Sequence, residues 1–251
     1  MVLPTPIDQA DLDFDNGSFD AAAFTAQTLA SWQALAAIID HTLLKPEATR
    51  AQVEALCNEA LRYQFACVMV NPMWVSTAVG VLSGSGVSTG AVIGFPFGAS
   101  LVSTIRQEAS ALIRLGAREL DMVIPIGQLK SGNHHAVHHA IRTATSVAHH
   151  HGAVLKVILE TSLLSVAEKL RGSEIAIQAG ADFIKTSTGF GASGATPADI
   201  ALIRGIAGGR CGVKASEGIR TVADVKAMLE AGANRIGTSG SVAIVRELGA
   251  E

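Results

Sequence analysis

The chain has 251 residues, of which 49% are hydrophobic, 16% charged and 4% aromatic, with a formal net charge of −3 at pH 7. It is too apolar for a disordered chain and long enough to bury a full core. Without a basic excess or an aromatic stacking surface, nucleic acid and anionic membranes are excluded as main partners.

The N-terminal part is acidic, and the first basic residue is Lys45. We predict that residues 1–35 form an acidic extension with one short helix around Ala21–Leu35, followed by a single domain over 36–251. Signal and transit peptides need early positive charge, so we expect neither. The three cysteines are far apart and form no CxxC motif, which is typical of a reducing cytoplasm.

The segment from Tyr63 to Ile105 contains no Asp, Glu, Lys or Arg. A membrane span needs about 20 predominantly apolar residues in a row. This segment is instead interrupted by Asn, Pro, Ser and Gly residues, among them Asn71, Pro72 and Gly84. We predict two buried strands flanking a weakly polar helix, and no membrane span.

Short apolar runs recur without strict polar alternation, as expected for parallel strands covered on the outside. Six of them are Ala66–Val70, Val87–Ile93, Leu120–Ile124, Val154–Leu159, Phe183–Ile184 and Arg235–Ile236. A run at Ala36–Ile39 and the segment that ends at Lys214 bring the number of predicted strands to eight. Helical patterns lie between them, for example at Glu47–Arg62, Ile105–Leu115, Val166–Gln178, Pro197–Ile206 and Thr221–Glu230.

One tripeptide pattern occurs four times where a predicted helix ends and a strand begins. Its first residue is apolar or histidine, and glycine and alanine follow, with the glycine at Gly116, Gly152, Gly180 and Gly232. Glycine fits this place because the residue after a helix often adopts a left-handed conformation. Strands and helices that alternate with a unit near 30 residues predict a parallel α/β fold, and eight strands favour a single (β/α)8 TIM barrel. A doubly wound open sheet is the alternative, although no GxGxxG motif follows the first strand.

In such a barrel, chemistry occurs at the C-terminal ends of the strands. Charged residues embedded in, or directly following, the apolar runs are Asp40, Asp121, Lys156, Glu160, Lys185 and Lys214. Buried ion pairs that connect the strands are one explanation. Two lysines on consecutive strands favour another, because neighbouring ammonium groups repel and one of them loses its proton more easily.

A neutral lysine attacks a carbonyl and forms a Schiff base. Lys185 or Lys214 could be the nucleophile, with the other one adjusting its pKa, and Asp121 could transfer protons. These residue types indicate carbonyl chemistry, with carbon–carbon cleavage or formation as the simplest class.

Seven segments resemble, in sequence and order, those of the deoxyribose-phosphate aldolases, over about residues 36 to 245. They are Ile39-Asp-His-Thr-Leu-Leu-Lys45, Val92-Ile-Gly-Phe-Pro-Phe-Gly98, Leu120-Asp-Met-Val-Ile124, Leu155-Lys-Val-Ile-Leu-Glu-Thr161, Gly180-Ala-Asp-Phe-Ile-Lys-Thr-Ser-Thr-Gly-Phe190, Val213-Lys-Ala-Ser216 and Arg235-Ile-Gly-Thr-Ser239. The resemblance implies a class I aldolase on a (β/α)8 barrel. Its reaction interconverts 2-deoxy-D-ribose 5-phosphate with D-glyceraldehyde 3-phosphate and acetaldehyde.

By the same resemblance, Lys185 is the Schiff-base lysine, Lys214 keeps it reactive, and Asp121 works with a water in proton transfer. Lys156 matches a partner of this charged cluster. Positions that match contacts to the sugar and its phosphate are Asp40, Thr42, Thr188, Gly189, Gly218, Gly237 and Ser239. The resemblance implies a homodimer, small-molecule aldehydes and a sugar phosphate as partners, and no cofactor or metal, because the iminium supplies the electron sink.

Glu217 departs from the family pattern, which has two glycines where this chain reads Glu217-Gly218. Loops after the seventh and eighth strands of barrels commonly bind phosphate through backbone N–H groups. A carboxylate about 5 Å from a phosphate charge repels it by roughly 3 kcal/mol at an effective dielectric of 20. An enzyme that favours unphosphorylated aldehydes is therefore an alternative, unless Glu217 points into solvent.

Met69 is the second departure, because many family members have cysteine at this position, whereas this chain has Cys67 two residues earlier. A thioether does not add to unsaturated aldehydes as a thiolate does, so inactivation through a thiol at this position should be absent. We expect Met69 to fill the core. His41 follows Asp40 and either lines the site or has a structural role.

Seven histidines cluster between residues 134 and 151. His134 and His138, like His135 and His139, are spaced for one helix face, a spacing that can hold a metal. No carboxylate lies within the cluster, so a solvated helix face outside the barrel is the favoured interpretation. Two other functions remain open at this point: a phosphosugar barrel enzyme without a covalent lysine, and a non-catalytic binding barrel.

Overall fold

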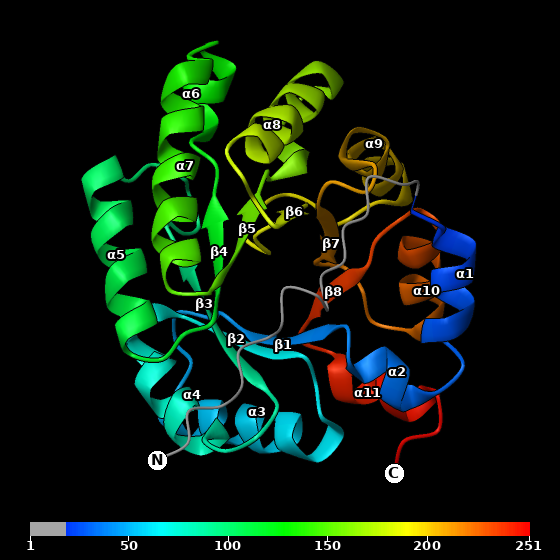
Figure 1. Ribbon diagram of the computed structural model, residues 1–251. Helices are drawn as coiled ribbons and strands as arrows, with labels where there is room; N and C mark the ends of the chain where they lie inside the picture. The colour runs from blue at the N-terminus through cyan, green and yellow to red at the C-terminus, as the bar shows by residue number, and fades with distance from the viewer. Residues whose placement is uncertain (1–18) are drawn as a thin grey trace.

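Eight parallel strands close into a barrel in chain order in the computed structural model, which describes residues 19–251 (Figure 1). The strands are β1 (Ile39–Leu43), β2 (Cys67–Val70), β3 (Ser88–Ile93), β4 (Glu119–Val123), β5 (Val154–Ile158), β6 (Phe183–Lys185), β7 (Gly212–Ser216) and β8 (Arg235–Thr238). The closed sheet confirms the predicted (β/α)8 barrel, and the alternative of an open doubly wound sheet is wrong.

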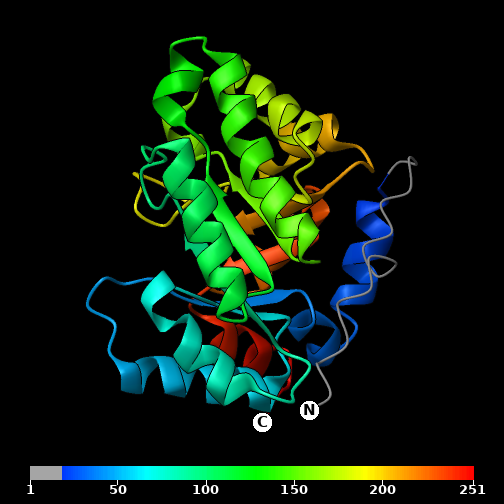
Figure 2. The ribbon, with the colours of Figure 1, turned by 60° about the vertical axis from the view of Figure 1, so that its left-hand side comes forward.

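Helices surround the barrel and cover the outer faces of the strands (Figures 1 and 2). They are α1 (Ala21–Thr28), α2 (Trp32–Ala36), α3 (Arg50–Tyr63), α4 (Val75–Leu82), α5 (Val102–Arg114), α6 (Ile126–Lys130), α7 (His134–His150), α8 (Val166–Gln178), α9 (Pro197–Ala207), α10 (Val222–Glu230) and α11 (Ser241–Glu247), with short 3-10 turns at Pro72–Trp74 and Thr161–Leu163. The main core lies between this layer and the sheet. Packing on both faces explains why the strands lack polar alternation.

The N-terminal region differs from its prediction in two places. The expected single helix is two helices, α1 and α2, and α1 packs beside α10 (Figure 1). The predicted start of the first strand, at Ala36, is wrong. Ala36 is the last residue of α2, whose N-terminus is capped by Ser31, and β1 begins at Ile39. A fully buried helical turn and a buried strand have the same apolar pattern over so few residues. Residues 1–18 of the predicted extension lie outside the described residues.

Other local predictions are confirmed. Helix α8 has the predicted bounds, and the Thr196 hydroxyl caps α9 by accepting the N–H of Asp199 at 3.1 Å. The charge-free segment from Tyr63 to Ile105 forms β2, α4 and β3, as expected. Within residues 19–251, no helix is both long and apolar enough to cross a bilayer.

The four junction glycines all adopt the positive φ that their position after a helix predicts, between 66° and 110°. Gly232 shows why a side chain is not tolerated there. A Cβ atom on Gly232 would lie 2.6 Å from Cγ of Arg204. The Arg204 guanidinium donates to the carbonyl of Gly232 at 2.8 Å and to Oδ1 of Asn234 at 3.2 Å. This junction therefore connects α9, α10 and β8 through one arginine.

We expect Gly232→Ala to lower the free energy of unfolding by about 1–3 kcal/mol, because it adds backbone strain and displaces Arg204. Gly205→Ala is the matched control, since Gly205 lies inside α9 with no atom within 4 Å of its Cβ position. That control should be neutral or stabilising by up to about 1 kcal/mol. Urea unfolding measures both, and equal stability of Gly232→Ala and wild type would contradict the prediction.

Candidate active site

Four titratable residues of neighbouring strands lie inside the barrel because of their register. Asp121 on β4 pairs with Lys156 on β5, and Lys185 at the end of β6 pairs with Lys214 on β7. Asp121, Lys156 and Lys214 are fully buried, and Lys185 is 2% exposed. Lys185 is the last residue of its strand and therefore lies at the C-terminal end of the barrel, here called the mouth.

Asp121 is the centre of this group, because its carboxylate accepts hydrogen bonds from three ammonium groups. Its Oδ1 accepts from Nζ of Lys156 at 3.0 Å, and its Oδ2 accepts from Nζ of Lys185 at 2.9 Å and of Lys214 at 2.8 Å. Lys185 and Lys214 thus share a single oxygen atom. The structure brings together the residues that the sequence predicted to act as a unit.

A second set of charges lies deeper in the barrel. Asp40 accepts from Lys214 and from Nε of Arg235 at 2.6 Å, and Glu119 accepts from Lys156 and from Nη2 of Arg235 at 2.9 Å. Asp40 therefore belongs to the ion network below the reactive amine. The sequence analysis did not assign roles to Glu119 and Arg235, although both are charged residues within apolar strands.

The pKa of Lys185 is lowered to about 8. Burial is the largest cause, and the positive charges of Lys214 and Lys156 add to it, while Asp121 opposes the shift. The cluster holds four cations and three carboxylates, so one positive charge has no carboxylate of its own. A lysine with this pKa is neutral in about a tenth of molecules at pH 7, against fewer than about one in a thousand for an ordinary lysine.

The remaining charges of the cluster are held in their ionised forms. Burial disfavours the charge on Lys156, but Asp121, Asp40 and Glu119 outweigh it and raise the pKa of Lys156 well above its usual value. Burial likewise disfavours the carboxylate of Asp121, but the three lysines lower its pKa well below the usual range. Lys185 is thus poised to lose a proton while Lys156 remains a cation.

The loop after β6 is fixed by a carboxylate. Glu160 follows β5 with φ of 58°, and its Oε2 accepts from the hydroxyl of Thr188 and from its N–H at 3.2 Å. The Thr188 hydroxyl is therefore held by Glu160. The next residue, Gly189, has φ of 89°. In the sequence, Glu160 is conspicuous only as a charge beside an apolar strand, and nothing there indicates this role.

Two other predicted contact residues have structural partners. The Thr42 hydroxyl donates to the carbonyl of Asp40 at 2.9 Å. A Cβ atom on Gly237 would lie 2.8 Å from Cε of Lys214, so this glycine makes room for the lysine inside the barrel. Ser239 lies exposed just beyond β8.

Ser187 is a residue that the sequence analysis missed. It lies two residues after Lys185 and is 1% exposed, and its hydroxyl has no hydrogen-bond partner within residues 19–251. A buried hydroxyl without a partner, two residues along the chain from Lys185, is a candidate contact for a substrate oxygen. The segment Lys-Thr-Ser-Thr alone gives no signal that distinguishes this serine.

His41 has a structural role. It follows Asp40 in β1 and therefore points to the opposite face of the strand. One ring nitrogen, Nδ1, lies 2.9 Å from Oγ of Ser241, and the other, Nε2, lies 2.7 Å from Oε2 of Glu59. The ring connects the barrel wall to α11 and α3, and the alternative that it lines the site is wrong.

Met69 and Cys67 both project into the barrel interior. A Cβ atom on Gly90 would lie 2.5 Å from Cε of Met69 and 2.9 Å from Sγ of Cys67, so the glycine of the neighbouring strand makes room for both. Met69 is fully buried, which confirms its packing role. Burial and the nearby carboxylates raise the pKa of the Cys67 thiol well above its usual value.

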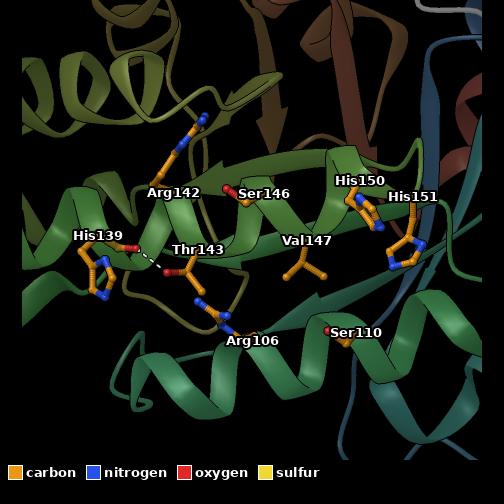
Figure 3. A pocket seen from close by; sticks show the side chains of 9 residues that line it. All are labelled: Arg106, Ser110, His139, Arg142, Thr143, Ser146, Val147, His150 and His151. Carbon is orange, nitrogen blue, oxygen red and sulfur yellow. Dashed lines mark hydrogen bonds between the residues drawn. The ribbon is translucent and has the colours of Figure 1, made fainter.

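The clustered histidines lie on α7 and just beyond it, outside the barrel. Figure 3 shows a groove between α5 and α7, of about 550 Å³, with Arg106 reaching toward α7 and Arg142 pointing away from α5. The rings of His135 and His139 stack at 6.5 Å. The groove contains no residue of the lysine cluster.

Within residues 19–251, Asp40, Cys67 and Glu119 are the one group of three or more potential metal ligands that lie close together, and none of the clustered histidines belongs to it. The carboxylates of this group already bind Arg235 and Lys156, whose charges oppose a metal ion.

Comparison with known proteins agrees with this geometry. The profile of the DeoC/LacD family aldolases matches residues 34–246. A deoxyribose-phosphate aldolase of Geobacillus sp. is 51% identical over 84% of this chain and 94% of its own. That of Lysinibacillus sphaericus is 50% identical over 86% and 96%. The crystallographic neighbours include a tetrameric deoxyribose phosphate aldolase from Aeropyrum pernix, 35% identical, with a TM-score of 0.83 over 90% of this chain and 96% of that one.

The barrel and its family match define the chain as a member of the DeoC/LacD family of aldolases. Within that family it groups with the deoxyribose-phosphate aldolases, and it is a lyase. A non-aldolase phosphosugar enzyme and a non-catalytic barrel are thereby set aside. The homodimer and the cytoplasmic location stay predictions.

The pH dependence of catalysis should report the lowered pKa of Lys185. Because only the neutral amine attacks a carbonyl, kcat/KM should rise with pH through about 8. Lys214→Met removes a positive charge, so the pKa of Lys185 should rise and the profile move to higher pH. One unit of pKa would reduce the rate near neutrality about tenfold. Profiles from about pH 6 to about pH 10 test this, with Lys214→Arg as the charge-conserving control. Superimposable profiles for wild type and Lys214→Met would contradict it.

Cys67 should resist unsaturated aldehydes, because its thiol is buried and protonated. Intact mass and peptide mapping after crotonaldehyde treatment should find no adduct on the folded protein at any of the three buried cysteines. The same treatment in urea, where all three thiols are accessible, controls for reagent activity. An adduct at Cys67 of the folded protein would refute the expectation.

Proposed function

We propose that this aldolase interconverts 2-deoxy-D-ribose 5-phosphate with D-glyceraldehyde 3-phosphate and acetaldehyde through a Schiff base on Lys185. The observation that carries the proposal is the lowered pKa of Lys185, at about 8, in a cluster with more cations than carboxylates. The names of the relatives support the substrate. Lys185 ends its strand at the mouth and is 2% exposed, whereas Lys214 is fully buried, which supports Lys185 as the nucleophile.

In the cleavage direction, neutral Lys185 attacks the C1 aldehyde of the open-chain sugar. The carbinolamine loses water and becomes a protonated imine. The C3 hydroxyl then gives up its proton, the C2–C3 bond breaks, and its electron pair moves toward the iminium nitrogen. D-Glyceraldehyde 3-phosphate leaves, and an enamine remains on Lys185. Protonation of its C2 and hydrolysis release acetaldehyde and restore the lysine.

The neighbouring charges support these steps. Lys214 lowers the pKa of Lys185 through its positive charge. Asp121, together with a water, accepts and returns protons beside the imine nitrogen, since its Oδ2 already lies 2.9 Å from Nζ of Lys185. Lys156 holds the other oxygen of Asp121, Oδ1, at 3.0 Å and keeps the carboxylate in place.

The polar groups of the mouth are the proposed contacts for the rest of the substrate. Ser187 offers its unpartnered hydroxyl to a sugar oxygen. The backbone N–H of Gly218 and the exposed hydroxyl of Ser239 lie in the loops after β7 and β8, where barrels commonly bind phosphate, and the backbone N–H of Gly189 lies in the neighbouring loop after β6. Thr42, Asp40 and Thr188 form hydrogen bonds with other groups of the protein, and Gly237 makes room for Lys214, so these four residues shape the site around the substrate.

Borohydride reduction in the presence of acetaldehyde tests the Schiff base. We expect one added ethyl group per chain, mapped to Lys185, in the wild-type enzyme. Lys185→Gln should show no addition and lose activity, whereas Lys169→Gln, which removes a lysine paired with Asp199 on the outer helices, should be modified as wild type. An unmodified Lys185 in folded, active enzyme would overturn the proposal.

A further inference from the structure

Glu217 has a backbone conformation that glycine favours. It is one of three non-glycine residues within 19–251 with positive φ, at 72°, and the next residue, Gly218, has φ of 83°. Both directly follow β7 at the mouth. Such conformations are strained for a residue with a side chain and persist where the surroundings hold them, often at functional sites.

The side chain of Glu217 lies against the loop that follows the reactive lysine. Its Oε2 is 2.9 Å from the position that a Cβ atom would take on Gly189, four residues after Lys185. The backbone carbonyl of Glu217 likewise lies close to the position that a Cβ atom would take on Gly194, so the loops after β6 and β7 pack together. The side chain is exposed, and no ion pair or hydrogen bond of its carboxylate is found in the described part of the chain. An unneutralised negative charge therefore lies between the loops after β6 and β7.

The nearest cation along this loop does not neutralise it. The Arg220 backbone N–H donates to Oδ2 of Asp224 at 2.9 Å, and the guanidinium charge helps to lower the pKa of Asp224. Barrels bind phosphate in this region through backbone N–H groups, so a phosphate there would meet the carboxylate of Glu217. Repulsion between the carboxylate and a nearby phosphate weakens binding of the phosphorylated substrate, whereas a hydroxyl can donate a hydrogen bond to the same carboxylate.

We propose that Glu217 shifts the selectivity of this aldolase from phosphorylated toward unphosphorylated substrates, because its carboxylate repels a terminal phosphate and accepts a hydrogen bond from a terminal hydroxyl. The inference rests on the proposed aldol cleavage at Lys185. It assigns to a residue outside the lysine cluster the choice between phosphorylated and unphosphorylated substrates.

The test compares kcat/KM for 2-deoxyribose 5-phosphate with kcat/KM for 2-deoxyribose. Release of acetaldehyde, coupled to NADH oxidation by alcohol dehydrogenase, reports both reactions equally. We expect Glu217→Gln to raise the ratio of phosphorylated to unphosphorylated substrate at least tenfold, and Glu217→Gly to raise it at least as much. Glu230→Gln, which removes an exposed carboxylate at the end of α10, is the matched control and should leave the ratio within twofold.

Two variants separate charge from backbone access. Glu217→Gln removes only the charge, whereas Glu217→Gly also relieves the strained backbone. A ratio unchanged in both, or raised only by glycine, overturns the role of the charge. Borohydride trapping of wild type with acetaldehyde, which carries no phosphate, is measured beside these assays. Trapping on Lys185 with an unchanged ratio rejects the role of Glu217 alone, whereas folded enzyme that is not trapped rejects the Schiff base first.

Discussion

One carboxylate, that of Asp121, holds the interior of this barrel together. Three lysines from three strands donate to it, and two of them share one of its oxygens. Removing one partner of a buried ion pair leaves an uncompensated charge and is strongly destabilising. Burial inside this network, with the positive charges of Lys214 and Lys156, lowers the pKa of Lys185 to about 8. Structural integrity and reactivity thus depend on the same few atoms.

Much of the fold could be predicted from local patterns. Val166–Gln178 has clear periodicity and a serine cap before it, so its bounds are those of α8. The junction glycines mark where helices end, and their positive φ follows from that position. Ala36–Ile39 shows the limit, because four buried residues have no period that separates a helical turn from a strand. Only the capping contact of Ser31 distinguishes them, and it depends on how the chain enters the barrel.

The residues of the candidate site that carry the family pattern could be predicted from the sequence. Residues that contact one another only in the folded barrel were harder to predict. Lys185, Lys214 and Asp121 stand in apolar strands, where a charge is conspicuous. Arg235 and Glu119 meet across the barrel, 116 residues apart in the chain, and no spacing indicates that pair. His41 illustrates the opposite case, because a residue adjacent to Asp40 in the sequence lies on the other face of the strand, where it has the structural role that was one of its two expected roles.

The depth of Lys185 has a consequence for how a sugar is presented. With 2% of the residue exposed, Lys185 is more accessible to a slender open-chain aldehyde than to a broad ring. A pentose closed into its hemiacetal ring is broad and has no carbonyl to offer. An aldolase that cleaves a pentose at Lys185, as proposed above, would therefore draw on the small open-chain fraction, and its apparent affinity would fall in proportion to that fraction. Aldehydes that cannot cyclise are not limited in this way. The apparent affinities of the substrates would therefore depend on their ring-opening equilibria in solution as well as on the protein.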